Sequence, residues 1–549
     1  MRGLNGLAIA CIAFVLPDTS DAHPQHPHSR RDTAPTVNLG YEIHQGTVNT
    51  TGRYYLFSNI PYSQQPIGDL RFREPQAITV NSSHINLGAE YLQCYQAYPG
   101  WTLTQAAANA TSKAIVGSFD DPTQTESCLV LDVYVPSDVF DCPTAADAPV
   151  LVWIHGGGFT LGSKTSYGTP AGLVAKSQAD GQAGTIIVSI NYRLGLFGWL
   201  AGGDVTPNLG LYDQRFALEW IQQYIGRFGG SANRVTVMGE SAGASSIVHQ
   251  ITAYGGAEPV PFQAAIPQSP AFQFNIDVDT TYGLTFATAT QLVGSTVPDV
   301  AALRLLNSSV LAELNQAVVY PASKGNFNFG PTPDGDFVPK LPQILLYEGR
   351  FDQSLNLLIS HCSNESVTFT PTIGDANDLR QQLTEKFTEA SEATIDEILT
   401  DVYPDVSPTT PWQTEFARAV QLVSEAFFTC TTAYLAEAKG NATYNYLFAY
   451  PPGYHGEDLP YTFFNGDTTT LDDGLPVNAD LANALQEYIV AFTRTGNPND
   501  NSAGLPVFPR YGDDSTVIEF STAGVTTSVD DVRNSRCEWW QQAIIDGRV

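Results

Sequence analysis

Short apolar runs alternate with segments of helical periodicity along the first half of the chain. Residues 150–154 (VLVWI), 185–190 (TIIVSI) and 235–238 (VTVM) are wholly or almost wholly apolar over the length of a strand. Unbroken runs of this kind are typical of strands buried on both faces, as in a parallel sheet covered by helices. Between the second and third runs, apolar residues recur at helical spacing over residues 213–228, and a glycine pair follows. That spacing predicts an amphipathic helix that ends at the glycines.

The repeated order of strand, helix and strand predicts an α/β fold with a central, mostly parallel sheet flanked by helices. In the second half, residues 414–439 are helical by pattern, and the order of the elements there stays open. No linker, repeat or low-complexity tract follows about residue 35. We therefore expect one domain over residues 36–549.

Composition and charge exclude several classes of function. The chain has 549 residues, of which 43% are hydrophobic, so it is not a disordered polyelectrolyte. It carries 26 Lys and Arg against 56 Asp and Glu, which gives a formal net charge of −30. That charge repels phosphate backbones and anionic lipid surfaces, so we expect no nucleic-acid partner and no docking on a membrane. Nothing in the residues indicates an oligomeric state.

Residues 1–22 have the layout of a secretory signal peptide, with a basic start, an apolar centre over residues 6–16 and a small-residue site at Ala22. The apolar centre is shorter than the roughly 20 residues that span a bilayer, which disfavours the alternative of a membrane anchor. Residues 23–35 are polar and broken by prolines, as in a pro-segment or a disordered N-terminus, and contain a dibasic pair, a candidate processing site. We expect a secreted, extracellular protein.

Cysteines and glycosylation sequons fit that compartment. Six cysteines remain after the signal peptide, and an even number suits disulfide bonds, although spacing alone cannot choose among 15 pairings. They are Cys94, Cys128, Cys142, Cys362, Cys430 and Cys537. Candidate glycosylation sites of the sequon type are Asn49, Asn81, Asn109, Asn307 and Asn441.

A G-x-S-x-G motif, Gly239 to Gly243, follows the third apolar run directly, and a helical pattern continues behind it. A strand that turns sharply into a helix is the context of a nucleophile elbow, which holds a serine hydroxyl above the sheet. The glycines are needed because side chains on either side of the strained serine would clash with the backbone. Ser241 is therefore the candidate nucleophile.

A second glycine motif, His-Gly-Gly-Gly-Phe at residues 155–159, follows the first apolar run. Consecutive glycines let backbone N–H groups approach a ligand closely and donate to an oxyanion. In serine hydrolases with such a loop, these donors act together with the N–H group that follows the nucleophile. The predicted oxyanion donors are Gly157, Gly158 and Ala242, and His155 is expected to be structural.

These motifs closely resemble the type-B carboxylesterase/lipase family, which includes cholinesterases and fungal secreted lipases. The resemblance covers nearly all of the chain after the N-terminal segment and includes other family signatures. They are residues 57–62 (FSNIPY), 70–72 (LRF), 126–129 (ESCL), 191–195 (NYRLG) and 228–230 (FGG). The resemblance implies an α/β-hydrolase fold with a flap over a gorge, and a serine esterase that needs no metal and no organic cofactor.

The serine needs a base. By residue type, the candidates are His44, His84, His249, His361 and His455. The chain order of serine, acid and histidine in this hydrolase class leaves His361 and His455. His455 is favoured because it lies in a glycine-flanked loop after an apolar run, and because His455, Gly456 and Asp458 resemble the family's H-G-x-E/D. His361 leaves little room for a preceding acid.

For the orienting acid, Glu365 matches the glutamate of the family's G-x-N-x-x-E-G loop, although serines replace both glycines and Cys362 replaces the asparagine. Rivals are Asp334 and Asp336, which we expect to form a turn, and Asp375. The adjacent sequon at Asn364 is expected to stay bare, because a glycan there would crowd the gorge.

The resemblance also implies two disulfide bonds, Cys94–Cys128 beside the gorge and Cys430–Cys537 near the C-terminus. Cys142 and Cys362 are left over as a further possible pair. The predicted reaction is hydrolysis of a small-molecule ester through a Ser241, His455 and Glu365 triad and an acyl-enzyme.

The substrate stays open. Apolar residues between Cys94 and Cys128 form either a lipase lid or part of the core, so a general carboxylesterase is favoured over an interfacial lipase. A specialised esterase of secreted natural-product metabolism is a further alternative. A non-catalytic adhesion-type member is disfavoured, because it would be expected to lack one of the catalytic groups.

Overall fold

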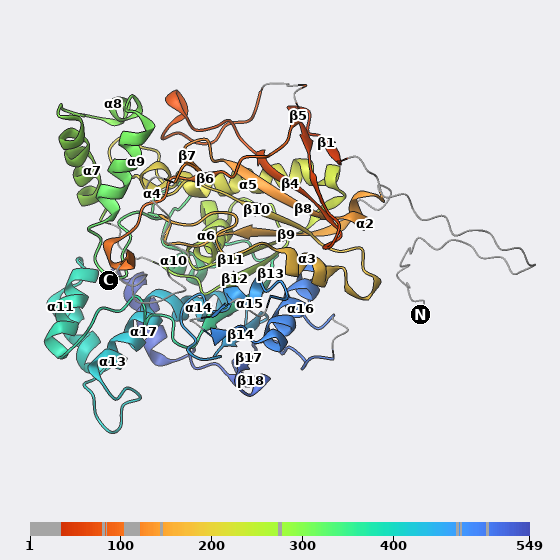
Figure 1. Cartoon of the computed structure of the whole chain (residues 1–549). Coiled ribbons are helices and arrows are strands. Elements are labelled where there is room, and N and C mark those ends of the chain that lie inside the picture. Colours follow the sequence, from red (N-terminus) through yellow and green to blue (C-terminus); the bar gives the residue numbers. More distant parts are fainter. Residues whose placement is uncertain are drawn as a thin grey trace, which may run out of the picture. The chain divides into compact units, whose positions relative to one another are not determined.

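The fold is built around one large mixed sheet, shown in a computed structural model (Figure 1). The structure describes residues 34–79, 83, 85–103, 121–142, 147–272, 277–467, 471–472, 475–500 and 504–549. The expected signal peptide, Asn81, His84 and Asn109 lie outside these residues, as does most of the expected pro-segment. Residues Pro35–Val549 form one compact unit.

The sheet contains 11 strands within the described part of the chain. In spatial order they are β18 (Gly524–Val529), β17 (Thr516–Ser521), β14 (Tyr444–Phe448), β13 (Asn356–Cys362), β12 (Ala264–Gln268), β11 (Gly230–Glu240), β9 (Ala148–Ile154), β10 (Ile186–Ile190), β8 (Val130–Pro136), β4 (Tyr54–Pro61) and β3 (Thr47–Asn49). The pairs from β10 to β17 are parallel, and the remaining pairs at the two edges are antiparallel. The predicted mostly parallel α/β sheet is confirmed.

Helices cover both faces of the sheet (Figure 1). One face packs against α3 (Ala171–Ser177), α15 (Leu459–Thr462) and α16 (Ala479–Thr495), and the other against α5 (Leu209–Tyr224), α6 (Ala242–Thr252), α10 (Pro342–Tyr347), α14 (Cys430–Ala438) and α17 (Ser535–Ile545). Alternate residues of β9 belong to the two cores: Val152 packs on the α5 and α6 side, and Trp153 on the α16 side. This double burial explains why the strand is apolar at every position.

Further helices lie away from the sheet. They are α7 (Val278–Val293), α8 (Val300–Arg304), α9 (Ser308–Val319), α11 (Ala376–Lys386), α12 (Glu392–Glu397) and α13 (Glu415–Ser424). Shorter elements are α2 (Ser137–Phe140), α4 (Gly195–Trp199), β1 (Thr36–Asn38), β2 (Ile43–Gln45), β5 (Ile85–Asn86), β6 (Gln93–Cys94), β7 (Gln124–Thr125), β15 (Leu471–Asp472) and β16 (Leu475–Pro476).

The predicted helices occur with shifted or interrupted bounds. Over residues 213–228 the chain forms α5, which begins four residues earlier, and a 3₁₀ turn, Ile225–Phe228, after which Gly229 adopts φ 91°. Over residues 414–439 it forms α13, a π-helical turn (Glu425–Thr429) and α14. Such turns are frequent at functional sites, and this one reaches the site described next.

Candidate active site

Ser241 occupies the sharp turn between β11 and α6. Its backbone has φ 57° and ψ −123°, a conformation that non-glycine residues rarely adopt and that costs about 1–3 kcal/mol. A Cβ at Gly239 would lie 2.7 Å from the carbonyl oxygen of Ile154, and one at Gly243 would lie 2.1 Å from the same atom. The turn therefore requires glycine on both sides of the serine, as the motif predicts.

The glycine loop after β9 lies against this turn. Gly157 and Gly158 have φ of 106° and 59°, and an added Cβ would lie 2.4 Å from the Leu161 carbonyl oxygen or 2.3 Å from the Phe327 ring. The N–H groups of both glycines make no hydrogen bond within the described residues. Ala242 is the first residue of α6, whose N–H group has no partner inside the helix. Donors without an acceptor among the described residues thus lie beside the serine turn.

His155, the first residue of this loop, is held by its neighbours. Its ring stacks on Tyr192 at 4.4 Å between centroids, and Nδ1 lies 2.9 Å from the Gly156 carbonyl oxygen. Burial lowers its pKa to about 4. The ring therefore stays neutral and packs the loop, which agrees with the structural role expected for it.

His455 and Glu365 form a buried pair beside the serine turn. His455 Nδ1 lies 2.5 Å from Glu365 Oε2, and the two side chains are 6% and 0% exposed. The loop that carries Glu365 follows β13, and the loop that carries His455 follows β14, its parallel neighbour. Because parallel strands end at the same edge of a sheet, two residues 90 positions apart meet there.

Glu365 is held as an anion. Burial would raise its pKa, but His455, the Ser269 hydroxyl and the Cys362 N–H group lower it below the ordinary value. The Cys362 N–H donates to Oε1 at 2.6 Å, which leaves Oε2 for the imidazole. The serines that stand in place of the two family glycines therefore leave the carboxylate in position to bind the imidazole.

Glu240 is a further carboxylate of the site, and the sequence reasoning missed it. Its Oε1 lies 3.2 Å from His455 Nε2 without the alignment of a hydrogen bond, and neither atom has a hydrogen-bond partner among the described residues. Burial raises the pKa of Glu240 to about 8. Burial alone would lower the pKa of His455, yet Glu240 and Glu365 together raise it to about 9. The feature of the sequence that could have identified Glu240 is its position next to Ser241 at the end of a buried strand.

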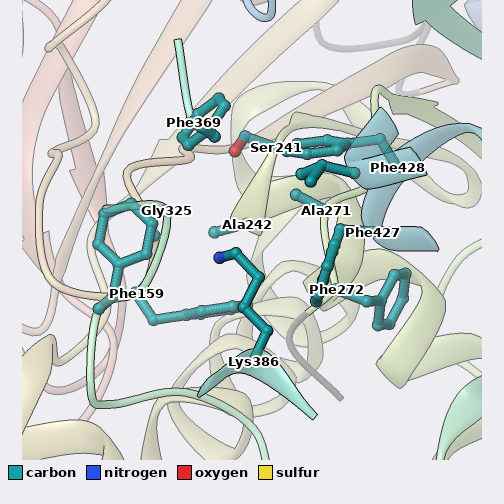
Figure 2. A pocket seen from close by; sticks show the side chains of 13 residues that line it. Phe159, Ser241, Ala242, Ala271, Phe272, Gly325, Phe369, Lys386, Phe427 and Phe428 are labelled. Carbon is teal, nitrogen blue, oxygen red and sulfur yellow. The ribbon is translucent and has the colours of Figure 1, made fainter. Parts of the chain in front are cut away.

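The position of His455 relative to Ser241 follows from shared neighbours. Its ring makes edge contacts with Phe369 and Phe428, at centroid distances of 5.2 and 4.8 Å. Both phenylalanines line a pocket together with Ser241 (Figure 2). Since Glu240 also precedes Ser241 in the chain, Nε2 of His455 faces the serine turn.

The rival residues have other tasks. Asp334 accepts hydrogen bonds from the N–H groups of Asp336 and Val338, which makes the expected turn. Asp375 caps the N-terminus of α11. His361 lies within β13 and binds Asp530, with Nε2 3.1 Å from Oδ1. None of these residues makes a hydrogen bond or ion pair with His455 or Ser241 in the described part of the chain, so the structure offers no support for them as the acid or the base.

The other two described histidines that were candidates by residue type also lie elsewhere. His249 is buried in α6, and burial lowers its pKa to about 3. His44 lies in β2 between Glu42 and the carbonyl oxygen of Ser58.

The pocket beside Ser241 is strongly aromatic (Figure 2). Its volume is about 480 Å³, counting the part that is open to solvent. The π-helical turn contributes two consecutive residues to it, and four other segments contribute the rest of the aromatic lining. The phenylalanines are Phe159, Phe272, Phe327, Phe369, Phe427 and Phe428. Gly158 and Ala242 line the pocket together with the serine, so an apolar arm of a ligand fits beside the two glycine motifs.

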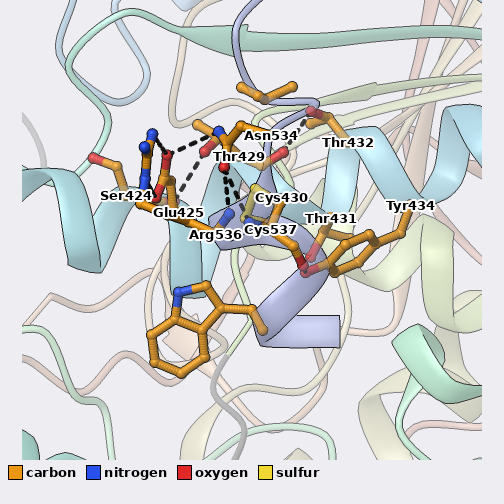
Figure 3. The surroundings of a disulfide bond; sticks show 12 residues. Ser424, Glu425, Thr429, Cys430, Thr431, Thr432, Tyr434, Asn534, Arg536 and Cys537 are labelled. Carbon is orange, nitrogen blue, oxygen red and sulfur yellow. Dashed lines mark hydrogen bonds and ion pairs between the residues drawn. A yellow bond between two sulfur atoms is a disulfide. The ribbon is translucent and has the colours of Figure 1, made fainter. Parts of the chain in front are cut away.

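Both disulfide bonds implied by the resemblance are present. Cys94–Cys128 joins β6 to the segment before β8, and Cys430–Cys537 joins α14 to α17. The second closes a loop of 107 residues, worth about 4–5 kcal/mol in the chain-entropy account. Beside it, Arg536 pairs with Glu425 through two hydrogen bonds of 2.8 and 2.6 Å (Figure 3).

The leftover cysteines are not joined to each other, because Cys362 is a buried thiol. Burial raises its pKa well above the ordinary value.

The described sequons differ in their surroundings. Asn307 is exposed at the start of α9. The side-chain amide of Asn49 donates to the Tyr54 hydroxyl, and that of Asn441 donates to Asp513. Asn364 is exposed, and its amide donates to the Pro452 carbonyl oxygen at 2.7 Å. Glycosylation of Asn49, Asn307 and Asn441 stays a prediction, as does the absence of a glycan at Asn364.

The described residues contain neither a metal-binding cluster nor a membrane-spanning helix. No group of three or more His, Cys, Asp or Glu side chains in them is arranged to hold a metal ion. No helix in that part of the chain is long and apolar enough to span a membrane.

Comparison with known proteins identifies the family. Residues 35–540 match the carboxylesterase family. A carboxylesterase of Aspergillus clavatus, patB, is 37% identical over 542 residues, which cover 92% of this chain and 96% of that protein. A secreted lipase of Arthroderma benhamiae is 30% identical over 457 residues, which cover 78% and 86%. The crystal structure of EstA from Aspergillus niger matches with a TM-score of 0.80 at 25% identity, over 95% of this chain and 100% of that one. This chain therefore belongs to the carboxylesterase family, type B, and is a carboxylic ester hydrolase with the α/β-hydrolase fold.

Proposed function

We propose that this enzyme is a secreted serine carboxylesterase that hydrolyses a small-molecule ester through Ser241, His455 and Glu365. The observation that carries the proposal is the 2.5 Å contact between His455 Nδ1 and Glu365 Oε2, with Nε2 left without a hydrogen-bond partner among the described residues. This nitrogen faces the strained turn of Ser241, so the geometry suits a base that takes the proton of a nucleophilic hydroxyl.

In the first half of the reaction, His455 Nε2 accepts the proton of Ser241 as Oγ attacks the ester carbonyl carbon. Glu365 accepts a hydrogen bond from Nδ1–H, and this bond orients the ring and stabilises the imidazolium. The N–H groups of Gly157, Gly158 and Ala242 donate to the oxyanion. The tetrahedral intermediate then collapses, and the alcohol leaves with the proton from His455.

In the second half, water attacks the acyl-enzyme and gives a proton to the same nitrogen, which passes it to Ser241 Oγ as the acid is released. Every group in this scheme is a side chain or a backbone amide of the chain, so the reaction calls on no cofactor. Removing one oxyanion donor in sites of this kind costs about 10²–10³ in rate. The strained serine and the glycine loop are the features that support this assignment.

A fluorophosphonate probe tests the proposal directly. The wild-type enzyme is expected to be labelled at Ser241 and to hydrolyse 4-nitrophenyl acetate, and Ser241→Ala is expected to lose both properties. Ser354→Ala, at an exposed serine, is the matched control and should keep both. Hydrolysis by Ser241→Ala at the wild-type rate would overturn the mechanism.

An interfacial lipase is the second candidate, because several relatives are named lipases. The two activities differ in their response to an oil–water interface. Turnover of tributyrin is compared below and above its solubility limit, with dissolved 4-nitrophenyl butyrate as the reference. A jump above the limit identifies a lipase, whereas saturation below the limit identifies an esterase.

Secretion of the mature chain is part of the proposal. It is supported by the relatives named secreted lipases, by the two disulfide bonds and by the expected signal peptide over residues 1–22. N-terminal sequencing of protein collected from the medium tests it. A first residue near Asp32 supports processing at the dibasic pair, and His23 excludes that step. Protein that keeps Met1 and stays in the cell contradicts secretion.

A further inference from the structure

The aromatic pocket beside Ser241 contains one charged side chain among the described residues that line it, Lys386. Figure 2 shows its amino group pointing into the pocket. All other lining residues are phenylalanine, glycine, alanine, valine or the serine itself. An ammonium group in such a wall is unusual, because removing a charge from water is costly unless a partner compensates it.

The position of Lys386 is set by its backbone neighbours. It is the last residue of α11, and the next residue, Phe387, is buried against Phe427 and Trp540. Nζ lies 5.5 Å from the centroid of the Phe427 ring. A Cβ at Gly325 would lie 3.2 Å from Nζ, so the absence of a side chain at Gly325 leaves room for the amino group. The side chain is thus held between two walls of the pocket.

The described residues satisfy the ammonium group of Lys386 only in part. It donates one hydrogen bond, to the Lys324 carbonyl oxygen at 3.3 Å, although an ammonium group has three donors. No carboxylate within the described part of the chain lies within ion-pair distance of it. Burial lowers its pKa to about 8, which still leaves the group mostly protonated at neutral pH. A charged donor therefore remains available to a ligand.

A merely structural task does not account for this placement. A cation in the last turn of a helix interacts favourably with the helix dipole, but an amino group in solvent would serve equally well there. The chain has a net charge of −30, whose general field repels an anion. Among the described residues that line the pocket beside Ser241, Lys386 alone supplies the opposite charge.

We infer that the pocket takes an ester whose arm carries a carboxylate, and that Lys386 binds this carboxylate through a charge-assisted hydrogen bond. The inference rests on the proposed function, because it concerns the substrate of that same site. The phenylalanines enclose the apolar part of the arm, and Lys386 selects the charged end. The carboxylate belongs to the acyl arm or to the alcohol arm, and the experiment distinguishes the two.

Two matched substrate pairs test the inference on the full-length secreted enzyme. The acyl pair is 4-nitrophenyl hexanoate and the 4-nitrophenyl half-ester of adipic acid, which differ only in the terminal carboxylate. The alcohol pair is hexyl butanoate and 6-(butanoyloxy)hexanoic acid. In the pair whose carboxylate lies on the arm that reaches Lys386, Lys386→Met is expected to lower kcat/KM for the carboxylate ester by roughly 10- to 100-fold. For the neutral ester of that pair, the loss should be less than about 3-fold.

Two further lysine variants distinguish a direct contact between Lys386 and the substrate carboxylate from the effect of the overall charge of the protein. Lys340→Met removes a positive charge at an exposed surface pair with Glu348 and is expected to change neither ratio. Lys386→Arg keeps the charge and is expected to keep most of the preference. Equal losses on both members of a pair in Lys386→Met would show a structural role and overturn the inference.

The wild-type enzyme gives an independent answer if Lys386→Met does not fold. An aromatic pocket without a cation would disfavour a carboxylate by more than about 10-fold, whereas this pocket should accept it at least as well as the neutral partner. Rejection of both carboxylate esters by wild type overturns the inference, while hydrolysis of the neutral esters and fluorophosphonate labelling leave the proposed function intact. Loss of those two properties counts against the proposed function instead.

Discussion

Two buried histidine–carboxylate pairs lie near each other at the end of the sheet and look alike by most measures. His455 pairs with Glu365 at 2.5 Å, and His361 pairs with Asp530 at 3.1 Å. The two histidine side chains are 6% and 7% exposed. Burial opposes the charge in both, yet the carboxylates raise both pKa values to about 9. Neither burial nor pKa distinguishes the candidate base from its neighbour.

The difference lies in the second ring nitrogen. His361 Nδ1 lies 3.1 Å from the Cys362 carbonyl oxygen, so both of its nitrogens face acceptors and the ring is held as an imidazolium. His455 Nε2 has no hydrogen-bond partner among the described residues, and its ring contacts two pocket phenylalanines. A base needs a nitrogen that can take a proton from a substrate or nucleophile. Access of one nitrogen, more than a shifted pKa, therefore marks the functional pair.

Replacing the two histidines gives the largest expected contrast. His455→Ala should lower kcat/KM for 4-nitrophenyl acetate by about 10⁴–10⁶, because no other group takes the serine proton. His361→Leu should keep the activity of the folded fraction within about 3-fold, since its nitrogens do not reach the pocket. Both are measured per mole of native enzyme, with near-ultraviolet circular dichroism as the check of folding. A larger loss in His361→Leu would reverse the assignment.

Replacing the carboxylate partners of the two histidines should give the same contrast in kcat, with a smaller loss than replacing the histidines. Glu365→Gln is expected to lower kcat by about 10³–10⁴, because an amide does not hold the imidazole in the required tautomer. Asp530→Asn is the matched control and should change kcat less than about 3-fold while lowering the temperature of unfolding. Steady-state kinetics and thermal scans give both quantities. Equal kinetic losses would mean that the pairs act as one network.

The pair formed by His361 should be visible in stability. Its pKa is raised above the unfolded value of about 6.5, so its contribution is complete below that pH and is lost as the pH rises through about 9. His361→Leu leaves Asp530 buried without its partner and should cost about 3–5 kcal/mol of unfolding free energy at pH 6. The difference from wild type should shrink by pH 9. Urea titrations at both pH values measure it.

His249→Leu is the control for that experiment. Burial lowers the pKa of His249 to about 3, so the ring is neutral throughout this pH window. Its replacement should cost the same free energy at pH 6 and at pH 9. A difference that stays constant for His361→Leu as well would show that the His361–Asp530 pair is not an ion pair.

Local patterns account for what the sequence predicts well. The buried strands are unbroken apolar runs, and the serine turn and the glycine loop each follow such a strand within a few residues. Gly239 and Gly243 are both needed because of one carbonyl oxygen, that of Ile154 on the neighbouring strand β9, yet the two glycines themselves stand in one short motif. Such motifs can be recognised in a sequence because the nucleophile and the glycines that its turn requires lie within a few residues of one another.

Contacts between distant segments account for what was missed. Lys386 and Phe427 meet Gly325 in the pocket, although long stretches of chain separate them and none belongs to a motif. His361 and Glu365 are four residues apart, and only the packing shows that one faces Asp530 and the other His455. The role of Glu240 depends on the loop after β14, which reaches it from more than 200 residues away. Pocket chemistry therefore requires the tertiary structure.

The smallest predicted effect concerns Glu240, which shares His455 with Glu365. Since these carboxylates raise the pKa of His455 to about 9, the base is protonated below that value, and kcat/KM should rise as the pH increases towards it. Glu240→Gln removes one of the two charges and should move this rise to lower pH by about 1 unit, with little change in the maximal rate. The pH profile for 4-nitrophenyl acetate between pH 5 and 10, corrected for spontaneous hydrolysis, measures the shift. Glu258→Gln, at an exposed carboxylate, is the control and should leave the profile in place. An unmoved profile in Glu240→Gln would mean that Glu365 alone sets the pKa, and the two histidine pairs would then be electrostatically equivalent.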